Sequence, residues 1–506
     1  MLVCIHEHNK VVAIFDHESQ ASIPIESTDI LKSLFLISRN FSNRIIIWAE
    51  KSIEEYIAYD YIKASFNIKN KMISYGEVFY VSDRIGYVED SPFLKVSKSV
   101  CYPTWLMSGT IGAIHASELL KYKDIIKSNE FDYALNSIAK LGMPKGLFCY
   151  SNPKLLNNEK IKCPQEKIST LSLFKFVKQH YKWVWVWILF LNFILHERKV
   201  NLVAILYTLF FKKINTNFKH HLKAVETFSI DKLPSIDVIL PTIGREECLY
   251  DVLKDLALQT HLPEKVIIIE QNPEINSSSK LAYLKTEKWP FKICHNFTHQ
   301  TGACNARNMA LKLVTSEFVF LGDDDNRFGE TLIENALKFM LEYNVNVFTT
   351  TYLQEHEKQV SKDFIQWPTF GAGNSFMKTS LIKKVSFDLG FEFGYGEDAD
   401  YGAQLRNIGE DIIYNPLINI LHLKAPIGGF RTKMKQKWDG EKILPKPSPT
   451  VLLNYLKNRT DFQVLGYKTI LFLKFYTKQP IKNPFKYRQM MRKRWNKSVY
   501  YANQLL

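Results

Sequence analysis

The second half of the chain alternates two patterns of apolar residues. Four apolar runs have the length and the β-branched or aromatic content of strands: 236–240, 265–270, 291–297 and 317–321. Three segments place apolar residues at intervals of three and four, as on one face of a helix: 249–256, 306–313 and 332–341. This alternation predicts an α/β domain that begins near residue 235.

Polar clusters follow three of the predicted strands directly. They are Pro241-Thr242-Ile243-Gly244-Arg245, Glu270-Gln271-Asn272 and Asp323-Asp324-Asp325. In open α/β sheets, ligands bind outside the carboxyl ends of the strands. We therefore expect the three clusters to line one crevice.

The third cluster places three aspartates side by side after an apolar strand. Adjacent carboxylates repel one another and resist burial, so their charge must be offset. Alone, such a triplet is typical of a solvated turn or a helix N-cap. At a strand end, two carboxylates at i and i+2 can instead present oxygens to a hard cation such as Mg²⁺ or Mn²⁺.

Three glycine-bearing segments accompany these clusters: QTGACNARNMAL (300–311), GAGNSFMKTSLI (371–382) and FEFGYGEDADYGAQLRNIG (391–409). The first opens a helix that carries Arg307, an arrangement that suits a diphosphate or the nucleoside next to it. In the second, small residues around Gly373 and Asn374 let the backbone approach a ligand. The chain has neither a P-loop nor a dinucleotide-binding fingerprint.

The third segment places Glu397, Asp398 and Asp400 at the start of a predicted helix. Acidic residues in a first helical turn often serve only as partners of the helix dipole. One of them can alternatively act as a general base.

Together these segments resemble the inverting nucleotide-sugar glycosyltransferases of family 2, which have the GT-A fold. The resemblance covers about residues 235–430 and rests on five motifs in order: VILPTIGREECLYDVLKDLALQT, GACNARNMAL, FLGDDDN with its DxD, GAGNSFMK and GYGEDADYGAQLRNIG. It implies transfer of a sugar from a nucleoside-diphosphate sugar to a hydroxyl group, with a divalent metal ion and inversion at the anomeric carbon.

The resemblance implies a role for each matching residue. Thr242 and Glu270 would lie near the nucleoside, Arg307 near the base or diphosphate, and Asp323 near the ribose or donor sugar. With the neighbouring strand-end and small residues, the predicted donor-binding set is Pro241, Thr242, Arg245, Glu270, Arg307, Asp323, Asp324, Gly373 and Asn374.

The same resemblance implies metal and acceptor residues. Asp325, the second acid of the DxD, would contact Mg²⁺ or Mn²⁺, with Asp323 and His422 completing the metal site. Asp398 would be the base that removes the proton of the acceptor hydroxyl. Glu397 and Asp400 would support the acceptor or the geometry of the site.

Two segments leave questions open. Glu270-Gln271-Asn272 stands where the family commonly has an acidic pair before Gly-Ser, so the identity of the nucleotide stays open. The loop KAPIGGFRTK (424–433) is either a lid that closes over phosphates or an ordinary surface loop.

The longest apolar stretch, WVWVWILFLNFIL (183–195), is separated by the charged HERK from a second run, LVAILYTLFF (202–211). Both are shorter than the roughly 20 residues that a membrane-spanning helix needs. Flanking lysines and three tryptophans favour a membrane-surface segment, and a pair of buried helices is the alternative. The basic and aromatic C-terminal tail (469–495) favours the same surface.

The composition of the chain predicts the charge of its partner and the compartment in which it works. Lys and Arg outnumber Asp and Glu by 66 to 51, for a net charge of +15, which suits an anionic partner. Seven scattered cysteines without a CxxC pair indicate neither a disulfide framework nor a zinc site. The N-terminus lacks the apolar core of a signal peptide, so we expect a cytoplasmic protein.

The first third of the chain resembles the second half. EVFYVSDR (77–84) matches EFVFLGDD, 103–120 matches 368–382, and 131–156 matches 398–418. These matches predict a degenerate GT-A-like domain, in which Asp83 stands alone without a DxD. An unrelated α/β domain is the alternative.

The sequence therefore predicts four segments: a degenerate GT-A-like α/β domain (1–160), an apolar and basic helical linker (161–230), a catalytic GT-A domain (231–440) and a basic helical tail (441–506). The expected partners are a nucleotide-sugar donor, a glycan or lipid-linked saccharide acceptor and an anionic membrane surface, with no nucleic acid. We expect a peripheral protein on the inner face of the membrane. A nucleotidyltransferase and a non-catalytic scaffold of a glycan-assembly complex are the alternatives.

Overall fold

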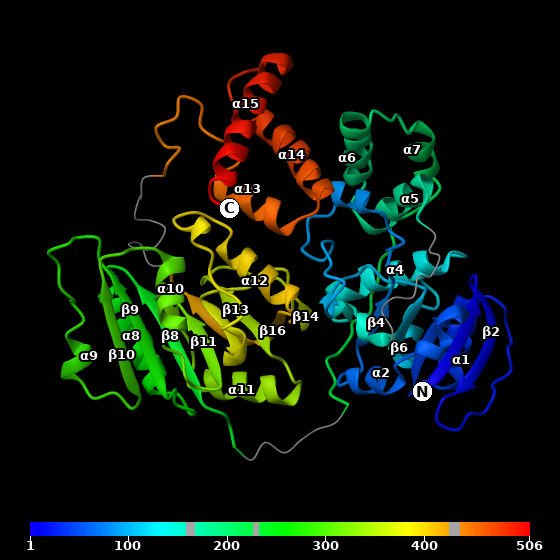
Figure 1. Cartoon of the computed structure of the whole chain (residues 1–506), viewed down its shortest axis with the longest axis horizontal. Coiled ribbons are helices and arrows are strands. Elements are labelled where there is room, and N and C mark those ends of the chain that lie inside the picture. The colour runs from blue at the N-terminus through cyan, green and yellow to red at the C-terminus, as the bar shows by residue number, and fades with distance from the viewer. Residues whose placement is uncertain (158–166, 226–231, 425–435) are drawn as a thin grey trace. The chain divides into compact units, whose positions relative to one another are not determined.

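The computed structural model describes residues 1–157, 167–225, 232–424 and 436–506. Its contacts divide the chain into two compact units, each with its own sheet (Figure 1). Unit 1 contains Met1–Glu226, Asp363–Gln366 and Arg459–Lys474. Unit 2 contains Thr227–Lys362, Trp367–Asn458 and Phe475–Leu506. The apolar helices of 167–225 therefore belong to unit 1, and the two units share the segment 441–506.

The sheet of unit 2 contains the four strands predicted from the apolar runs. Its strands are β8 (Ile236–Thr242), β9 (Lys265–Gln271), β10 (Lys292–Thr298), β11 (Phe318–Gly322), β12 (Asn326–Arg327), β13 (Val347–Leu353), β15 (Asn374–Lys378) and β16 (Ile413–His422). They lie in the order β10-β9-β8-β11-β15-β13-β16-β12. β8 to β11 are mutually parallel, whereas β15 runs antiparallel to both β11 and β13.

The helices of unit 2 are α8 (Glu246–Ala257), α9 (Tyr283–Thr286), α10 (Ala303–Leu311), α11 (Leu332–Glu342), α12 (Glu397–Asn407), α13 (Pro449–Asn458) and α15 (Pro484–Asn503), with 3₁₀ turns at Thr379–Leu381 and Leu389–Phe391. Three of them, α8, α10 and α11, form where the periodicity predicts. The predicted apolar positions of α8, Leu249, Val252, Leu253 and Leu256, are all buried. Because β8 and β9 are buried along their length, their carboxyl ends deliver polar side chains to one edge of the sheet.

Unit 1 is also mixed α/β. Its strands are β1 (Leu2–Glu7), β2 (Lys10–Asp16), β3 (Ile45–Glu50), β4 (Lys71–Tyr75), β5 (Tyr102–Pro103), β6 (Ile111–His115) and β7 (Phe148–Ser151), and β14 (Ile365–Gln366) falls in the same unit. Its helices are α1 (Ile30–Asn40), α2 (Tyr59–Ser65), α3 (Ala116–Leu120), α4 (Phe131–Gly142), α5 (Thr170–His180), α6 (Val184–Asn192), α7 (Leu202–Thr208) and α14 (Asp461–Tyr476). Shorter helical turns lie at Lys51–Tyr56, Asp83–Tyr87, Met143–Lys145, Pro153–Leu155 and Phe193–Glu197.

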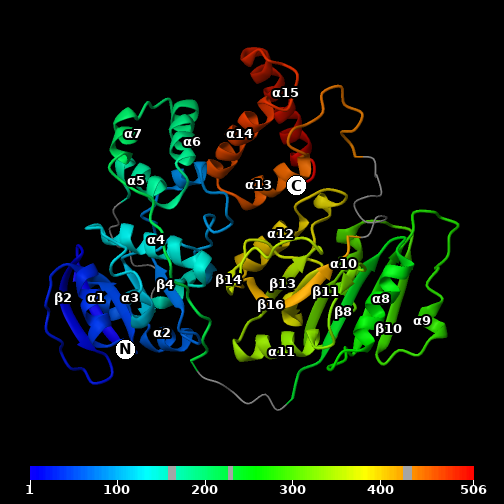
Figure 2. The ribbon, with the colours of Figure 1, turned by 180° about the vertical axis from the view of Figure 1, so that it is seen from behind.

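Alternation along the strands of unit 1 builds two apolar layers. Leu2 and Trp48 belong to the larger core cluster, and Val3 and Ile47 belong to the smaller one. Since neighbouring residues of a strand point to opposite faces, each layer covers one face of the sheet. The helices α5, α6 and α7 form one helical layer of the unit in both views (Figures 1 and 2).

The two sheets share a topology. The path β1-β3-β6-β4-β7 has parallel, antiparallel, antiparallel and parallel pairings in that order. The path β8-β11-β15-β13-β16 has the same four pairings in the same order. The predicted fold class, a mixed α/β catalytic domain preceded by a second domain of related architecture, is confirmed.

One predicted strand of the repeat is wrong. Residues 77–82 form no strand, and Asp83 begins a 3₁₀ turn instead of following a strand. The strand that corresponds to β11 is β3, because Ala49 pairs with Ile111 as Gly322 pairs with Asn374. The apolar residues of 77–84 line a pocket instead of pairing, as described below.

Candidate active site

Two arginines offset the charge of the aspartate triplet at the end of β11. Arg307 Nη2 donates to Asp323 Oδ1 at 2.8 Å. Arg245 Nη1 donates to Asp324 Oδ1 at 2.7 Å and to Asp325 Oδ2 at 3.2 Å. Burial raises the pKa of Asp324 to about 6, although the arginine opposes that shift. The triplet is thus a set of paired carboxylates, with Asp324 and Asp325 buried and Asp323 half-buried, and not a solvated turn.

Thr242, at the end of β8, completes the environment of the middle aspartate. Its hydroxyl donates to Asp324 Oδ2 at 2.7 Å. Both Thr242 and Arg245 therefore hold Asp324 in a fixed position. The structure thus brings together the first and third strand-end clusters, as the sequence predicts.

His422 lies beside Asp325 because β12 pairs with β16. The register places Asn326 opposite His422, and His422 Nε2 lies 3.6 Å from Asp325 Oδ1. An imidazole nitrogen and a carboxylate are both suitable ligands for Mn²⁺, and a carboxylate suits Mg²⁺. Among the described residues, no group of three His, Cys, Asp or Glu side chains is arranged to hold a metal ion. These two residues fit a site whose remaining ligands come from a substrate diphosphate and water.

Asp323, the other carboxylate of the DxD, has different partners. Tyr352 donates its hydroxyl to Asp323 Oδ2 at 3.2 Å, so both oxygens of Asp323 are hydrogen-bonded within the protein. A side chain at Gly373 would place its Cβ 2.1 Å from Asp323 Oδ2. Only glycine therefore fits here, which explains the small residue in this motif. Tyr352 also stacks on the ring of His422 with centroids 4.4 Å apart.

The N-terminus of α10 is capped by a carboxylate of the protein. Glu392 accepts hydrogen bonds from the backbone N–H groups of Cys304 and Asn305, at 3.1 and 2.9 Å. Gly302 has a φ of 138°, and a Cβ there would overlap Glu392. Burial raises the pKa of Glu392. The helix terminus that the sequence suggested for a diphosphate is thus held by Glu392, and Arg307 of the same helix faces the aspartates.

The first turn of α12 brings two acids to the same site. Asp398 is half-buried and accepts a hydrogen bond from the backbone of Ala372, while its buried Oδ1 has no partner within the described residues. Burial and the charge of Glu397 raise the pKa of Asp398 to about 7, although Arg307 opposes that shift. Burial also raises the pKa of Glu397. A carboxylate with a free oxygen and a pKa near 7 is well suited to accept a proton.

Arg307 connects the two groups of acids. Burial lowers the pKa of its guanidinium, but the charges of Asp323, Asp398 and Glu397 outweigh burial and raise it. Asp323 in turn helps to raise the pKa of Asp398. The triplet of β11 and the acids of α12 therefore belong to one electrostatic site in unit 2.

Comparison with known families identifies this region. The model of the family "Glycosyl transferase family 2" matches residues 237–393. Residues 237–393 belong to glycosyl transferase family 2. The match begins in β8, includes the aspartate triplet and Gly373, and ends just before α12.

Named relatives of this glycosyltransferase domain cover part of the chain. An uncharacterized glycosyltransferase of Rickettsia conorii is 27% identical over 180 residues, which are 34% of this chain and 29% of that protein. The GalNAc(5)-diNAcBac-PP-undecaprenol beta-1,3-glucosyltransferase of Campylobacter jejuni is 24% identical over 188 residues, 34% of this chain and 60% of that protein. The chain thus spans less than two thirds of either relative.

Solved structures resemble the chain more weakly. S. aureus TarS 1–349 is 16% identical, with a TM-score of 0.34, over 53% of this chain and 91% of that one. The mannosyltransferase PcManGT of Pyrobaculum calidifontis, in complex with GDP-Man and Mn²⁺, is 13% identical, with a TM-score of 0.34, over 54% and 88%. Likenesses at these TM-scores support no inference about substrate.

The remaining predicted residues of the glycosyltransferase domain have other partners. Glu270, at the end of β9, is 2.8 Å from His295 Nε2 and accepts from the backbone N–H of Lys280 at 3.2 Å. Asn374 donates to Thr349 Oγ1 at 2.8 Å and so fixes the start of β15. Pro241 lies in β8 next to Thr242. The loop 425–433 lies outside the described residues.

Asp400 points away from the site of the glycosyltransferase domain. It is buried and accepts from Asn458 Nδ2 at 2.9 Å and from Gln404 Nε2 at 2.7 Å. Lys457 Nζ lies 3.0 Å from Asp400 Oδ1. Asp400 therefore anchors α12 to α13 and supports the geometry of the site without facing it.

The sequence reading missed Tyr352, Glu392 and Asn326. Asn326 donates to the carbonyl of Gly373 at 2.7 Å, and its Oδ1 lies 2.8 Å from the Tyr352 hydroxyl, whose one hydrogen is shared between Asn326 and Asp323, so Asn326 ties the triplet to the glycine motif. Tyr352 lies at the end of β13, the same sheet edge as the predicted clusters. That position is the signal that could have identified it.

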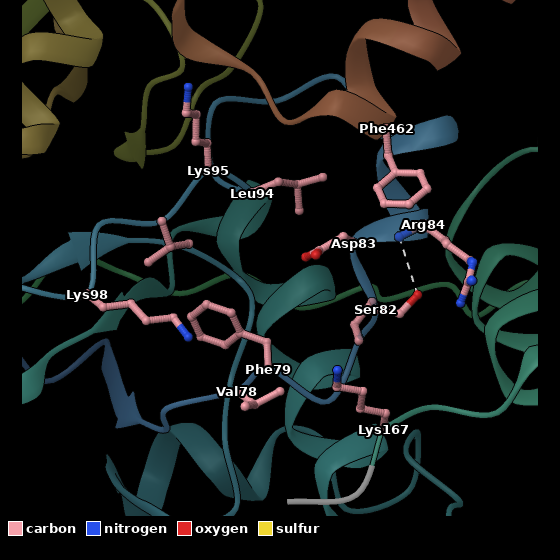
Figure 3. A pocket seen from close by; sticks show the side chains of 12 residues that line it. Val78, Phe79, Ser82, Asp83, Arg84, Leu94, Lys95, Lys98, Lys167 and Phe462 are labelled. Atoms are coloured by element: carbon pink, nitrogen blue, oxygen red, sulfur yellow. Dashed lines mark hydrogen bonds between the residues drawn. The ribbon is translucent and has the colours of Figure 1, made fainter. Parts of the chain in front are cut away.

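Asp83, the single acid of the predicted repeat, lies in unit 1 at a pocket of about 450 Å³ (Figure 3). Four cations line this pocket: Arg84, Lys95, Lys98 and Lys167. Val78 and Phe79 line it as well, so this apolar run contributes to the wall of a pocket and not to the sheet. Asp83 is thus not the counterpart of the triplet.

Register identifies the true counterparts in unit 1. Glu50, the last residue of β3, and the next two residues, Lys51 and Ser52, stand in register where the three aspartates follow β11. Asp132, in the first turn of α4, accepts from the backbone N–H of Gly109 at 2.7 Å, just as Asp398 accepts from Ala372. Gly109 and Ala372 each lie two residues before the equivalent strands β6 and β15. Unit 1 therefore keeps the aspartate at the helix start but has a lysine inside its strand-end cluster.

Proposed function

We propose that the chain is an inverting glycosyltransferase that moves a sugar from a nucleoside-diphosphate sugar to a hydroxyl of a growing glycan. The observation that carries this proposal is Arg307, whose charge acts on both Asp323 and Asp398. A donor site and a base for the acceptor must lie close together, and this arginine joins the residues of both. The family of residues 237–393 supports the same reaction class.

In this mechanism Asp398 accepts the proton of the acceptor hydroxyl as that oxygen attacks the anomeric carbon. The leaving group departs on the opposite side, so one displacement inverts the anomeric centre. Burial and Glu397 keep the pKa of Asp398 near neutrality, where a general base is most effective. Arg307 and Tyr352 hold Asp323 in a fixed orientation toward the donor.

A divalent cation is part of the proposal. Asp325 and His422 would hold it, with Asp323 nearby but engaged by Arg307. When bound, Mg²⁺ or Mn²⁺ neutralises the charge of the departing nucleoside diphosphate. Arg245 keeps Asp325 oriented, since its guanidinium lies between Asp324 and Asp325.

We also propose a lipid-linked saccharide as acceptor and a peripheral position on the cytoplasmic face of a membrane. The name of the Campylobacter jejuni relative specifies an undecaprenol-diphosphate-linked acceptor, which supports the first point. No helix within the described ranges has both the length and the apolar character needed to cross a membrane. The net charge of +15 suits an anionic surface.

The other reaction classes fit less well. A nucleotidyltransferase could use the strand-end carboxylates with a metal ion, but it has no use for Asp398 beside Glu397. A non-catalytic scaffold does not need a buried aspartate with a pKa near 7, because burying such a group opposes folding.

The experiment that tests the function is a screen of nucleotide sugars for release of nucleoside diphosphate, with Mg²⁺ or Mn²⁺ present. We expect one donor or a small set to be turned over and to raise the melting temperature of the full chain. If no donor is turned over and none stabilises the protein, a non-catalytic scaffold becomes the better hypothesis.

A pH profile tests the base assignment. Because the folded pKa of Asp398 is about 7, we expect kcat to rise with pH between about 6 and 8 as Asp398 loses its proton. In Glu397→Gln the neighbouring negative charge is absent, so the rise should move to lower pH. The measurement is kcat against pH for both proteins. A rise at the same pH in both would contradict the coupling of these two acids.

A further inference from the structure

Helix α7 exposes one apolar face and buries the other. Ala204, Ile205 and Thr208 are buried. Five large apolar side chains of the helix and the turn after it are each 60–83% exposed: Leu202, Val203 and Leu206 on α7, and Leu209 and Phe210 in the turn. Their spacing of i, i+1, i+4, i+7 and i+8 continues one helical face into the turn. Soluble monomeric proteins rarely expose so many neighbouring apolar side chains. Such a patch is typical of an interaction site.

Helix α6 and its flanks also expose apolar side chains. In Figures 1 and 2, α6 and α7 belong to the same helical layer of unit 1. Five side chains between residues 183 and 200 are exposed by 36–64%: Trp183, Val184, Trp187, Leu195 and Val200. We call these ten residues of α6, α7 and their flanks the α6–α7 surface. Tryptophan is the side chain most favoured at the level of lipid headgroups.

Cations flank the α6–α7 surface along the sequence. Residues 170–213 contain seven of them, Lys175, Lys178, Lys182, Arg198, Lys199, Lys212 and Lys213. The same range has one acid, Glu197, which is already paired with Arg84 at 2.7 Å and with Lys199 at 3.4 Å. Lys178 lies over the ring of Trp183 at 4.0 Å, so charge and aromatic surface are directly adjacent.

We propose that the α6–α7 surface docks unit 1 onto an anionic lipid bilayer, with its apolar side chains in the headgroup and acyl boundary and its cations on the lipid phosphates. Interfacial helices insert to roughly 5–10 Å in this way, using an apolar face and a basic rim. A second copy of the chain is a poorer occupant, because two such surfaces would bring their cations together. The proposal deepens the membrane part of the proposed function and is independent of sugar transfer.

The test is co-sedimentation of the full chain with vesicles of phosphatidylcholine, with or without about one third phosphatidylglycerol. We expect binding to the anionic vesicles that weakens as salt is raised, and much weaker binding to phosphatidylcholine alone. Leu206→Glu with Phe210→Glu should weaken binding at least tenfold. The matched control is Ile275→Glu with Val360→Glu, which alters equally exposed apolar residues of unit 2 and should bind like the wild type.

A second pair of variants tests the cations. Lys212→Ala with Lys213→Ala should lower the salt dependence of binding, whereas Lys285→Ala with Lys288→Ala, exposed lysines of unit 2, should not. All these side chains are exposed, so we expect each variant to fold. Circular dichroism, and release of nucleoside diphosphate from the donor in an assay with a soluble acceptor, check that it does. Absence of vesicle binding by the wild type, or equal binding by the Leu206 and Phe210 variant, overturns the proposal. A dimer that this variant dissociates, without vesicle binding, assigns the surface to a second copy instead.

Discussion

Asp398→Asn is expected to lower kcat at least about 100-fold while leaving donor affinity within about twofold of the wild type. The asparagine cannot accept the proton of the acceptor hydroxyl. It keeps a side-chain oxygen for the backbone N–H of Ala372, so the loop before β15 should hold its position. The measurements are steady-state kcat with the donor found in the screen, and titration of the same donor by calorimetry.

Asp132→Asn is the matched control for this variant. Asp132 holds the backbone of Gly109 in unit 1 as Asp398 holds Ala372 in unit 2, but the strand end beside it has Lys51 where unit 2 has an aspartate. We expect Asp132→Asn to keep full activity. A variant of Asp398 with more than about a tenth of wild-type kcat would contradict its assignment as the base. Loss of activity in Asp132→Asn would show that unit 1 takes part in the reaction.

Asp325→Ala is expected to remove the contribution of the metal ion to donor binding. In the wild type, Mn²⁺ should tighten nucleoside-diphosphate binding at least about tenfold, because the ion is shared between the protein and the diphosphate. In the variant the change should fall below about twofold. Arg245 keeps its bond to Asp324 at 2.7 Å, so the triplet stays folded. The measurement is calorimetric titration of nucleoside diphosphate with Mn²⁺ or with a chelator.

Asp251→Ala is a suitable comparison for the metal test. Asp251 is an exposed carboxylate of α8 whose ion-pair partner is Arg327 at 3.7 Å, well outside the aspartate triplet. It should show the same response to Mn²⁺ as the wild type. If Asp325→Ala also responds fully, Asp325 is not a metal ligand and the ion is held elsewhere.

Periodicity predicted many elements of unit 2 well because β8, β9 and β11 are buried along almost their whole length and α8 and α11 are amphipathic. The strand at 317–321 and the helix at 332–341 both form within a residue of the expected bounds. Strand-end logic then brought Thr242, Arg245 and the triplet together, since parallel strands deliver their carboxyl ends to one sheet edge. The positions of these residues follow from the order and direction of the strands, which the alternation of strand and helix patterns predicts.

The errors come from contacts between residues far apart in the chain. Glu392 accepts a hydrogen bond at the N-terminus of α10 from a position 88 residues further along the chain. No local sequence pattern predicts this contact. Residues 77–84 have the composition of a strand but line a pocket, because β3 already occupies the place beside β6. In unit 1 the matching aspartate was missed because register, and not motif similarity, aligns Asp132 with Asp398.

The anchor of α12 has a consequence for how the enzyme can be shortened. The recognised family region ends at residue 393, before Asp398, the proposed base. The helix that carries Asp398 is tied through Asp400 to Lys457 and Asn458 in α13. A protein truncated at the family boundary would lose Asp398, and one truncated before α13 would leave Asp400 buried without its cation. We therefore expect the smallest active fragment to extend past residue 458, well beyond the end of the family match.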